Sequence, residues 1–231
     1  MLASAVMLGA LTGCGGDKKE AAKSDVVKVG VFLPLTGDNA AGGELELRGV
    51  KLAHKLHPEV LGKKVELVVA DNKSDKAEAA SVAARLIEKD KVVTLIGTYG
   101  SSLAMAAGNI VKEAKVPAIG TSCTNPQVTA DCEVYFRLAF LDPFQGTVLA
   151  NYAYNELGVD TAYTLAMLGS DYDQGLVYYF TEAFKALGGT VVNEDFPEGS
   201  ANFVSYVNNA KAAGAGVIFA PVSINYAQLI V

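Results

Sequence analysis

The feature that most constrains the fold of this 231-residue chain is a regular alternation of short apolar runs with longer segments of helical periodicity. Segment 44–57 places Leu45, Leu52 and Leu56 on one side of a helix, and segment 76–89 repeats apolar residues at i, i+3, i+4 and i+7. Near-continuous apolar runs are typical of strands that a parallel sheet buries on both faces. Such runs occur at 27–33, 65–70, 92–97, 116–120, 161–168, 190–196 and 216–222, and further helical segments are expected at 102–114, 174–187 and 202–213. The alternation predicts an α/β fold.

A loop-like stretch divides this pattern into two halves. Residues 121–135 lack clear periodicity, and the next run, YFRLAF, leads into a new helical segment from Asp142. Because successive strand–helix units form open sheets covered by helices, we expect two doubly wound parallel-sheet lobes, at 26–140 and 141–231. The second half holds only three predicted strands and ends as a helical segment starts, so we expect a truncated second lobe.

The first residues look like the export signal of a bacterial lipoprotein. The run MLASAVMLGALTGCGG carries no charge, and its apolar stretch ends in small residues before Cys14, as at a signal-peptidase site. A transmembrane helix is less favoured, because the stretch is shorter than the roughly 20 residues needed to span a bilayer. We therefore predict that residues 1–25 are a signal and polar tether. A lipid on Cys14 would anchor the protein to a membrane, in the periplasm or at the cell surface.

Two further cysteines, Cys123 and Cys132, follow Cys14. In the oxidising compartment that an exported protein reaches, two cysteines usually pair, so we predict a Cys123–Cys132 disulfide. A metal site would need more ligands, and His54 and His57 lie on a predicted surface helix. The sequence therefore predicts no metal site.

Hydroxyl and glycine residues cluster where two predicted strands end. TYGSS (98–102) follows the third strand and TSCTNP (121–126) follows the fourth. In open parallel sheets, ligands bind outside the carboxyl ends of the strands. Each cluster places hydroxyls and backbone N–H groups at a helix start, where an anion is stabilised. Serine and threonine are also common helix N-caps, so spacing alone leaves a purely structural role open.

Charge and motifs argue against several other functions. The formal net charge is −6 and no basic stripe is present, which argues against nucleic acid as a partner. The chain has no GxSxG, GxGxxG, Walker A or HExxH motif, and no histidine in the strand-end loops that could activate a serine. We therefore expect neither an enzyme nor a bound cofactor.

Taken together and in order, several stretches resemble one known family. These are VKVGVFLPLTGD, VELVVADNKSD, TLIGTYGSS, VPAIGTSCTNP, YFRLAFLDPFQG, GSDYDQG and GVIFAP. Over residues 26–231 the chain resembles the type I periplasmic binding proteins for branched-chain amino acids, which serve ABC importers. The resemblance implies a two-lobed monomer that binds a small amino acid between its lobes, without chemistry, and docks on a membrane permease.

The resemblance also implies ligand roles for residues in the strand-end loops. Ser101 would bind the α-carboxylate, Thr124 would contact both carboxylate and ammonium, and Tyr172 would close over the ligand from the second lobe. The full set of implied ligand-binding positions is Tyr99, Gly100, Ser101, Ser102, Ser122, Cys123, Thr124 and Tyr172.

Two departures from the family pattern keep the ligand class open. An aromatic residue near the first loop is replaced by Gly42 and Gly43, and the family's acidic partner for the ammonium would lie beyond Val231. Amides, urea-like molecules and aromatic acids therefore remain alternatives to a branched-chain amino acid. Two further hypotheses are a small-molecule sensor lobe of the same fold and an enzyme on the same scaffold.

Overall fold

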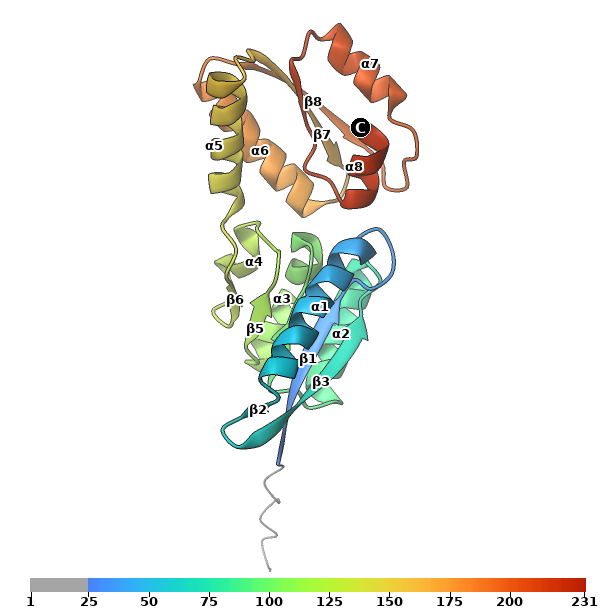
Figure 1. The fold of residues 1–231 in the computed structure, drawn as a ribbon, viewed down its shortest axis with the longest axis vertical. Helices are drawn as coiled ribbons and strands as arrows, with labels where there is room; N and C mark the ends of the chain where they lie inside the picture. The colour runs from blue at the N-terminus through green and yellow to red at the C-terminus, as the bar shows by residue number, and fades with distance from the viewer. Residues whose placement is uncertain (1–24) are drawn as a thin grey trace, which may run out of the picture.

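Two sheets of mainly parallel strands form the framework of the molecule, one above the other along its long axis (Figure 1). The structure is a computed structural model and describes residues 25–231. The six-stranded sheet has the order β2-β3-β1-β4-β5-β6, and the three-stranded sheet has the order β8-β7-β9. We call the part from β1 to β6 the first lobe and the part from α5 to α8 the second lobe. The chain passes between them once, through residues 138–141.

The elements of the first lobe follow the predicted alternation. They are β1 (Val26–Leu33), α1 (Ala40–Leu56), β2 (Glu59–Val60), β3 (Lys63–Asp71), α2 (Lys76–Glu88), β4 (Thr94–Ile96), α3 (Ser101–Ala114), β5 (Ala118–Gly120), α4 (Gln127–Ala130) and β6 (Tyr135–Arg137). Only β2 runs antiparallel to its neighbour, β3. The two-residue β2 and the four-residue α4 were not predicted, because such short elements carry no periodicity.

The second lobe repeats the pattern on a smaller sheet. Its elements are α5 (Asp142–Asn151), the π-helical turn η1 (Tyr152–Glu156), β7 (Thr161–Met167), α6 (Asp171–Ala186), β8 (Thr190–Phe196), α7 (Val204–Ala212), β9 (Val217–Phe219) and α8 (Ile224–Ile230). All pairs in this sheet are parallel. The predicted fold class is therefore confirmed: helices alternate with the strands of two mainly parallel sheets, as in an α/β architecture.

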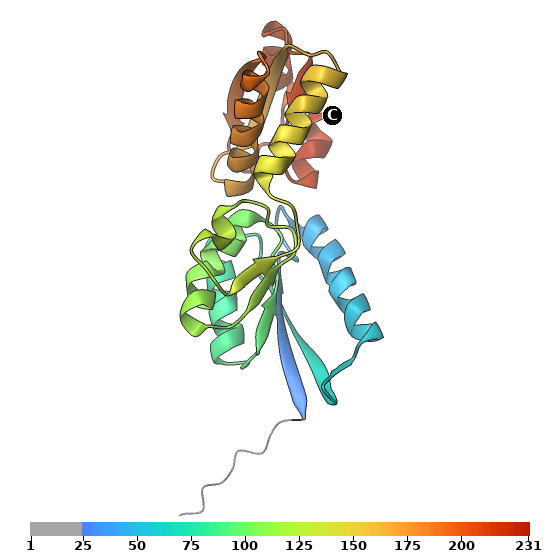
Figure 2. The same cartoon turned by 90° about the vertical axis from the view of Figure 1, so that its left-hand side faces the viewer.

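Helices cover both faces of each sheet. In Figure 2, α1 lies on one side of the first sheet, with α2 and α3 on the other. The first-lobe core lies on the α2 and α3 side, where Phe32, Leu86 and Leu95 are fully buried. In the second lobe, alternate residues of β7 enter two cores: Tyr163 packs with α7 and α8, and Ala162 packs with α5 and α6.

The predicted disulfide is wrong. Cys123 and Cys132 are both buried free thiols. The Cys132 thiol donates to the Gly108 carbonyl oxygen of α3 (3.7 Å), whereas Cys123 packs against Gly120, where an added Cβ would come within 2.1 Å of its Sγ. The two cysteines lie in the same buried cluster, yet their sulfur atoms are not bonded to each other.

The predicted lipidation site, Cys14, and nearly all of the 1–25 segment lie outside the described residues. From residue 25 onward, no helix combines the length and apolar character needed to cross a membrane. Nor does this part of the chain gather three or more metal-binding side chains at one place.

Candidate ligand-binding site

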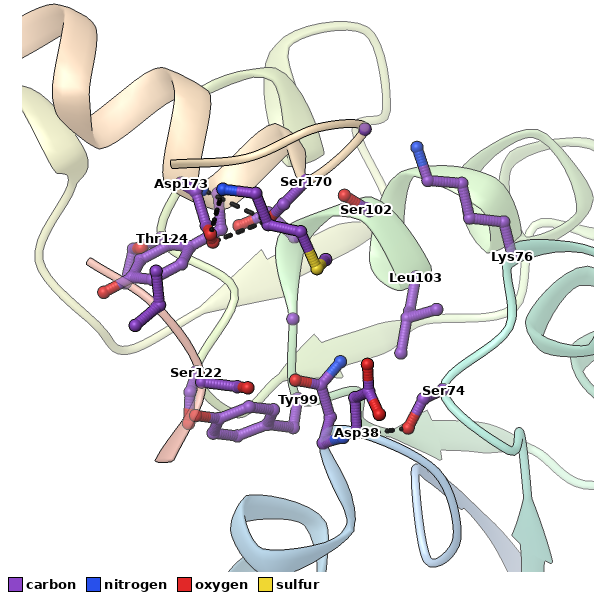
Figure 3. Close-up of a pocket in the computed structure, with 18 of the residues that line it drawn as sticks. Asp38, Ser74, Lys76, Tyr99, Ser102, Leu103, Ser122, Thr124, Ser170 and Asp173 are labelled. Carbon is purple, nitrogen blue, oxygen red and sulfur yellow. Dashed lines mark hydrogen bonds between the residues drawn. The ribbon is translucent and has the colours of Figure 1, made fainter. Parts of the chain in front are cut away.

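The topology of each sheet singles out one end for ligand binding. Strand order reverses direction at β1, which lies between β3 and β4, and again at β7, which lies between β8 and β9. Open α/β sheets bind ligands outside the carboxyl ends of strands at such switch points. A cavity of about 630 Å³ lies there, lined by residues that follow β1, β4 and β5 in the first lobe and β7 and β9 in the second. Figure 3 shows lining side chains from both lobes.

Seven of the eight predicted ligand-binding residues line this cavity. They are Tyr99, Gly100, Ser101, Ser102, Ser122, Thr124 and Tyr172. Cys123 is the exception: it is fully buried and absent from the lining, and burial raises the pKa of its thiol to about 11. Whether the seven bind a ligand stays a prediction, but the structure brings them to one place.

The two serines at the start of α3 have different partners. The Ser101 hydroxyl accepts a hydrogen bond from the Asn125 backbone N–H (3.1 Å), so the α3 start is tied to the β5 loop. A hydroxyl carries one proton of its own, and this bond leaves that proton free to be donated. The Ser102 hydroxyl instead accepts from the Asp171 backbone N–H of the second lobe (2.8 Å). Ser102 therefore links the two lobes.

Tyr99 occupies space that Gly42 of α1 leaves open. A Cβ added at Gly42, near the start of α1, would come within 2.5 Å of the Tyr99 ring. A Cβ at Gly43 would meet the Pro34 carbonyl oxygen at 1.9 Å, so α1 approaches the first loop closely only because this position is glycine. The structure thus supplies an aromatic wall from β4. Burial, aided by the negative charges of Glu46 and Asp173, raises the pKa of Tyr99.

Glu46 is a residue near the site that sequence analysis missed. Its carboxylate, on α1, accepts hydrogen bonds from the hydroxyls of Thr121 and Ser122, both of which line the cavity. Burial raises the pKa of Glu46, and the two hydroxyls partly offset that effect. Nothing in the local sequence pairs α1 with the β5 loop, so this contact carries no sequence signal.

Asp173 is a second missed residue, and here the sequence did hold a signal. Its oxygens accept from the Met167 backbone N–H (3.0 Å) and from the Ser170 hydroxyl (2.6 Å), and the Ser170 hydroxyl accepts from the Asp173 N–H (3.2 Å). The Ser170 hydroxyl thus caps the helix, a role readable from the pattern Ser-x-x-Asp, and α6 starts at Asp171, three residues before the predicted start. Burial raises the pKa of Asp173 to about 6.

Two groups of contacts join the lobes on either side of the cavity. On one side, Asp171 of the second lobe meets Lys76, with Nζ and Oδ2 3.0 Å apart, and its carbonyl oxygen accepts from Asn125 Nδ2 (2.8 Å). On the other side, the Tyr226 hydroxyl donates to Asp38 Oδ2 (2.7 Å), and Asn225 Nδ2 donates to the Asp38 carbonyl oxygen (2.9 Å). The structure therefore presents the two lobes in contact around the cavity.

The chemistry of the lining suits the holding of a small polar molecule. The lining residues carry hydroxyls, aromatic rings and carboxylates, and the lining within residues 25–231 contains neither histidine nor cysteine. Apolar side chains, among them Leu103, Phe140 and Val222, complete the walls. This mixture of an apolar surface with a few polar groups is usual for small-molecule sites.

Fold, cavity and chain topology together define a two-lobed solute-binding protein. A profile described as "Periplasmic binding protein" matches residues 26–229, and the chain belongs to that family. The family description implies a location outside the cytoplasm.

Particular relatives are branched-chain amino acid binders by name. The leucine-binding protein LivK of Thermotoga maritima superposes with a TM-score of 0.82 at 38% identity, covering 84% of this chain and 55% of that one. LivJ of Streptococcus pneumoniae, solved with isoleucine, gives 0.82 at 32% identity, covering 89% and 59%. An "Amino acid binding protein" of Pseudomonas aeruginosa is 34% identical over 205 residues, 86% of this chain and 54% of that protein.

The similarity also reaches proteins with a different kind of ligand. A solute-binding protein of Rhodopseudomonas palustris, solved with 3,4-dihydroxybenzoic acid, gives a TM-score of 0.77 at 29% identity, covering 86% of this chain and 55% of that one. The chain spans about half the length of the curated relatives it matches.

Proposed function

We propose that this chain forms the ligand-binding part of an extracytoplasmic solute-binding protein of an ABC importer, selective for branched-chain or related amino acids. Lobes 26–140 and 141–231 act as the halves of a clamp, which closes over the ligand by a hinge motion and then docks on a membrane permease. The lipid on Cys14 keeps the clamp near that permease. No bond of the ligand is made or broken.

The observation that carries this proposal is the arrangement of Ser101 at the cavity wall. Its oxygen is occupied by the Asn125 N–H, which leaves its proton for an acceptor in the cavity. It lies in the first turn of α3, where backbone N–H groups lack intrahelical acceptors and favour an anion. A carboxylate is the group that such a set of donors holds best, each charge-assisted bond contributing about 1.5–3 kcal/mol.

The amino acid class is further supported by the relatives named for leucine, isoleucine and valine. An aromatic acid is the second candidate, since it too presents a carboxylate and a relative was solved with such a ligand. The carboxylate of either class could accept a hydrogen bond from Ser101. The two classes therefore differ in how the remainder of the ligand fits the cavity.

Calorimetric titration of the full-length protein with leucine, isoleucine, valine and 4-hydroxybenzoate tests the proposal. We expect one of the three amino acids to bind, and we expect Ser101→Ala/Thr124→Ala to weaken that binding by about 100-fold or more, since two bonds to charged groups are lost. Ser81→Ala, an exposed position on α2, is the matched control. Unchanged affinity in the double variant would contradict the proposed binding site.

The lipid anchor is tested separately. A Cys14→Ser protein that stays with the membrane fraction would contradict lipidation of Cys14.

A further inference from the structure

A buried carboxylate beside the cavity has no hydrogen-bond partner for its oxygens. Asp142, the first residue of α5, is 0% exposed, and neither Oδ1 nor Oδ2 makes a hydrogen bond within the described part of the chain. An ionised carboxylate away from water is costly unless a donor or a cation compensates it. Burial accordingly raises the pKa of Asp142.

The Thr124 hydroxyl is the donor available to this carboxylate. The Asp142 N–H donates to the Thr124 carbonyl oxygen (3.2 Å), so the two residues are held together by their backbones. The Thr124 hydroxyl lies close enough to lower the pKa of Asp142, against the larger effect of burial. Thr124 is only 7% exposed, lines the cavity, and its hydroxyl makes no other hydrogen bond among residues 25–231.

Arg137 is the neighbouring cation, but its donors are used elsewhere. Its charge also lowers the pKa of Asp142 without forming an ion pair with that residue. The guanidinium instead donates to the loop that carries Thr124, at the carbonyl oxygens of Cys123, Asn125 and Pro126 and the hydroxyl of Thr129. Arg137 therefore fixes the loop, and the Thr124 hydroxyl remains the group that can satisfy Asp142.

Whether the Thr124 hydroxyl donates or accepts a hydrogen bond toward the ligand depends on where its single proton goes. An ionised carboxylate can only accept, so a hydroxyl that serves it must donate its proton there. Any further partner of the Thr124 oxygen, which is buried and makes no hydrogen bond among residues 25–231, must then be a donor. Ser101 has the opposite role and can donate to the ligand, because its oxygen already accepts from the Asn125 N–H and its proton is free. The cavity wall thus offers a donor at Ser101 and an acceptor at Thr124.

We infer that Asp142 is a positioning residue that accepts a hydrogen bond from the Thr124 hydroxyl. The Thr124 oxygen is then left to accept from the ligand, so the site selects a ligand that carries a protonated amino group alongside its carboxylate. The inference rests on the proposed function and narrows it, since an aromatic acid has no such donor. The charge of the lining agrees: its described residues include one cation, Lys76, and four carboxylates, Asp38, Asp75, Asp173 and Glu198.

The test compares L-leucine with 4-methyl-2-oxopentanoate, in which a carbonyl replaces the ammonium. Calorimetry with the full-length protein should show leucine binding at least 10-fold more tightly. In Asp142→Asn, whose amide can donate to Thr124, we expect leucine affinity to fall at least 10-fold while oxo-acid affinity holds or rises. Asp131→Asn, an exposed carboxylate of the first lobe, which also carries Thr124, should leave the ratio of the two affinities unchanged.

Two Thr124 variants keep the test decisive should Asp142→Asn fold poorly. Thr124→Ser retains the hydroxyl and should retain the preference for leucine, whereas Thr124→Val should lose it. In the Thr124→Val background, Asp142→Asn should change the affinity ratio less than twofold. Equal losses of both ligands in Asp142→Asn, or a preference that survives Thr124→Val, would overturn the inference and leave the proposed function standing. A wild-type protein that binds none of the three branched-chain amino acids would remove the proposed function, and the inference with it.

Discussion

The carboxylate of Asp173 makes the stability of the folded protein depend on pH. Burial raises its pKa from 3.8 to about 6. Between those values the folded protein holds the proton on Asp173 while the unfolded chain has released it. The folded state then binds more protons, so stability is greatest below pH 4 for this group and falls as the pH rises through 6.

Asp173→Asn removes this titration while its side-chain oxygen can still accept from the Met167 N–H. A shift of about two units corresponds to about 3 kcal/mol. We therefore expect the free energy of unfolding of the wild type, minus that of the variant, to decrease by about 2 kcal/mol between pH 4 and pH 7, most of the total change. Urea denaturation at unit pH steps measures it. Asp160→Asn, exposed in the same lobe, should give a flat difference, and a flat difference for Asp173→Asn as well would refute the assignment.

The site residues that lie within a single strand-end loop could be predicted from the sequence. The residues whose contacts depend on how two separate elements pack together could not. The clusters at 98–102 and 121–126 were predicted because strand ends and helix starts are visible locally, and the family resemblance then singled out Ser101 and Thr124 within them. Glu46 and the pairing of Asp142 with Thr124 depend on how α1 and α5 meet the β5 loop, which no local pattern encodes. The predicted Cys123–Cys132 disulfide was wrong for the same reason, since the position of each thiol depends on the tertiary contacts around it.

At the scale of elements, periodicity predicted the long helices and strands well and the environment of α1 badly. Strand β8 has the predicted bounds, 190–196, and α3 starts within one residue of its prediction. Leu45, Leu52 and Leu56, placed by spacing on one side of α1, are 58%, 57% and 65% exposed. The buried positions of α1 are instead Gly42 and Gly43, where the missing side chain permits a close approach to Tyr99 and Pro34.

This difference within α1 predicts opposite effects for two glycine substitutions. At Gly49 an added Cβ would meet nothing within 4 Å, so Gly49→Ala should stabilise the helix by about 0.5–1 kcal/mol. At Gly42 the same methyl would press on the Tyr99 ring, and Gly42→Ala should destabilise by about 1–3 kcal/mol as in other overpacked sites. Chemical denaturation of both variants measures the contrast. Equal effects would mean that the ring is free to move away from α1.

At the scale of the whole molecule, the contacts between lobes differ in how much they can stabilise the closed arrangement. The Lys76–Asp171 ion pair has side chains 54% and 39% exposed, so it should contribute at most about 1 kcal/mol. The Tyr226–Asp38 bond is better placed. The tyrosine is 5% exposed, and its hydroxyl is oriented by the Gly199 N–H at 2.9 Å while it donates to the carboxylate at 2.7 Å.

Asp38→Ala removes that bond and leaves Tyr226 bound to Gly199, so it isolates the link between lobes. Such a bond forms only when the lobes meet, and its loss should act on the closed, ligand-bound state by speeding dissociation and not by slowing association. We expect about a 10-fold weaker affinity for the bound amino acid, equivalent to about 1.4 kcal/mol, with the increase in the off-rate accounting for nearly all of it. Stopped-flow fluorescence gives both rates, and Asp131→Ala, at an exposed position of the first lobe, should change neither. A slower association with an unchanged off-rate would place Asp38 in ligand capture instead, because a contact made only after closure cannot hinder entry into an open cleft.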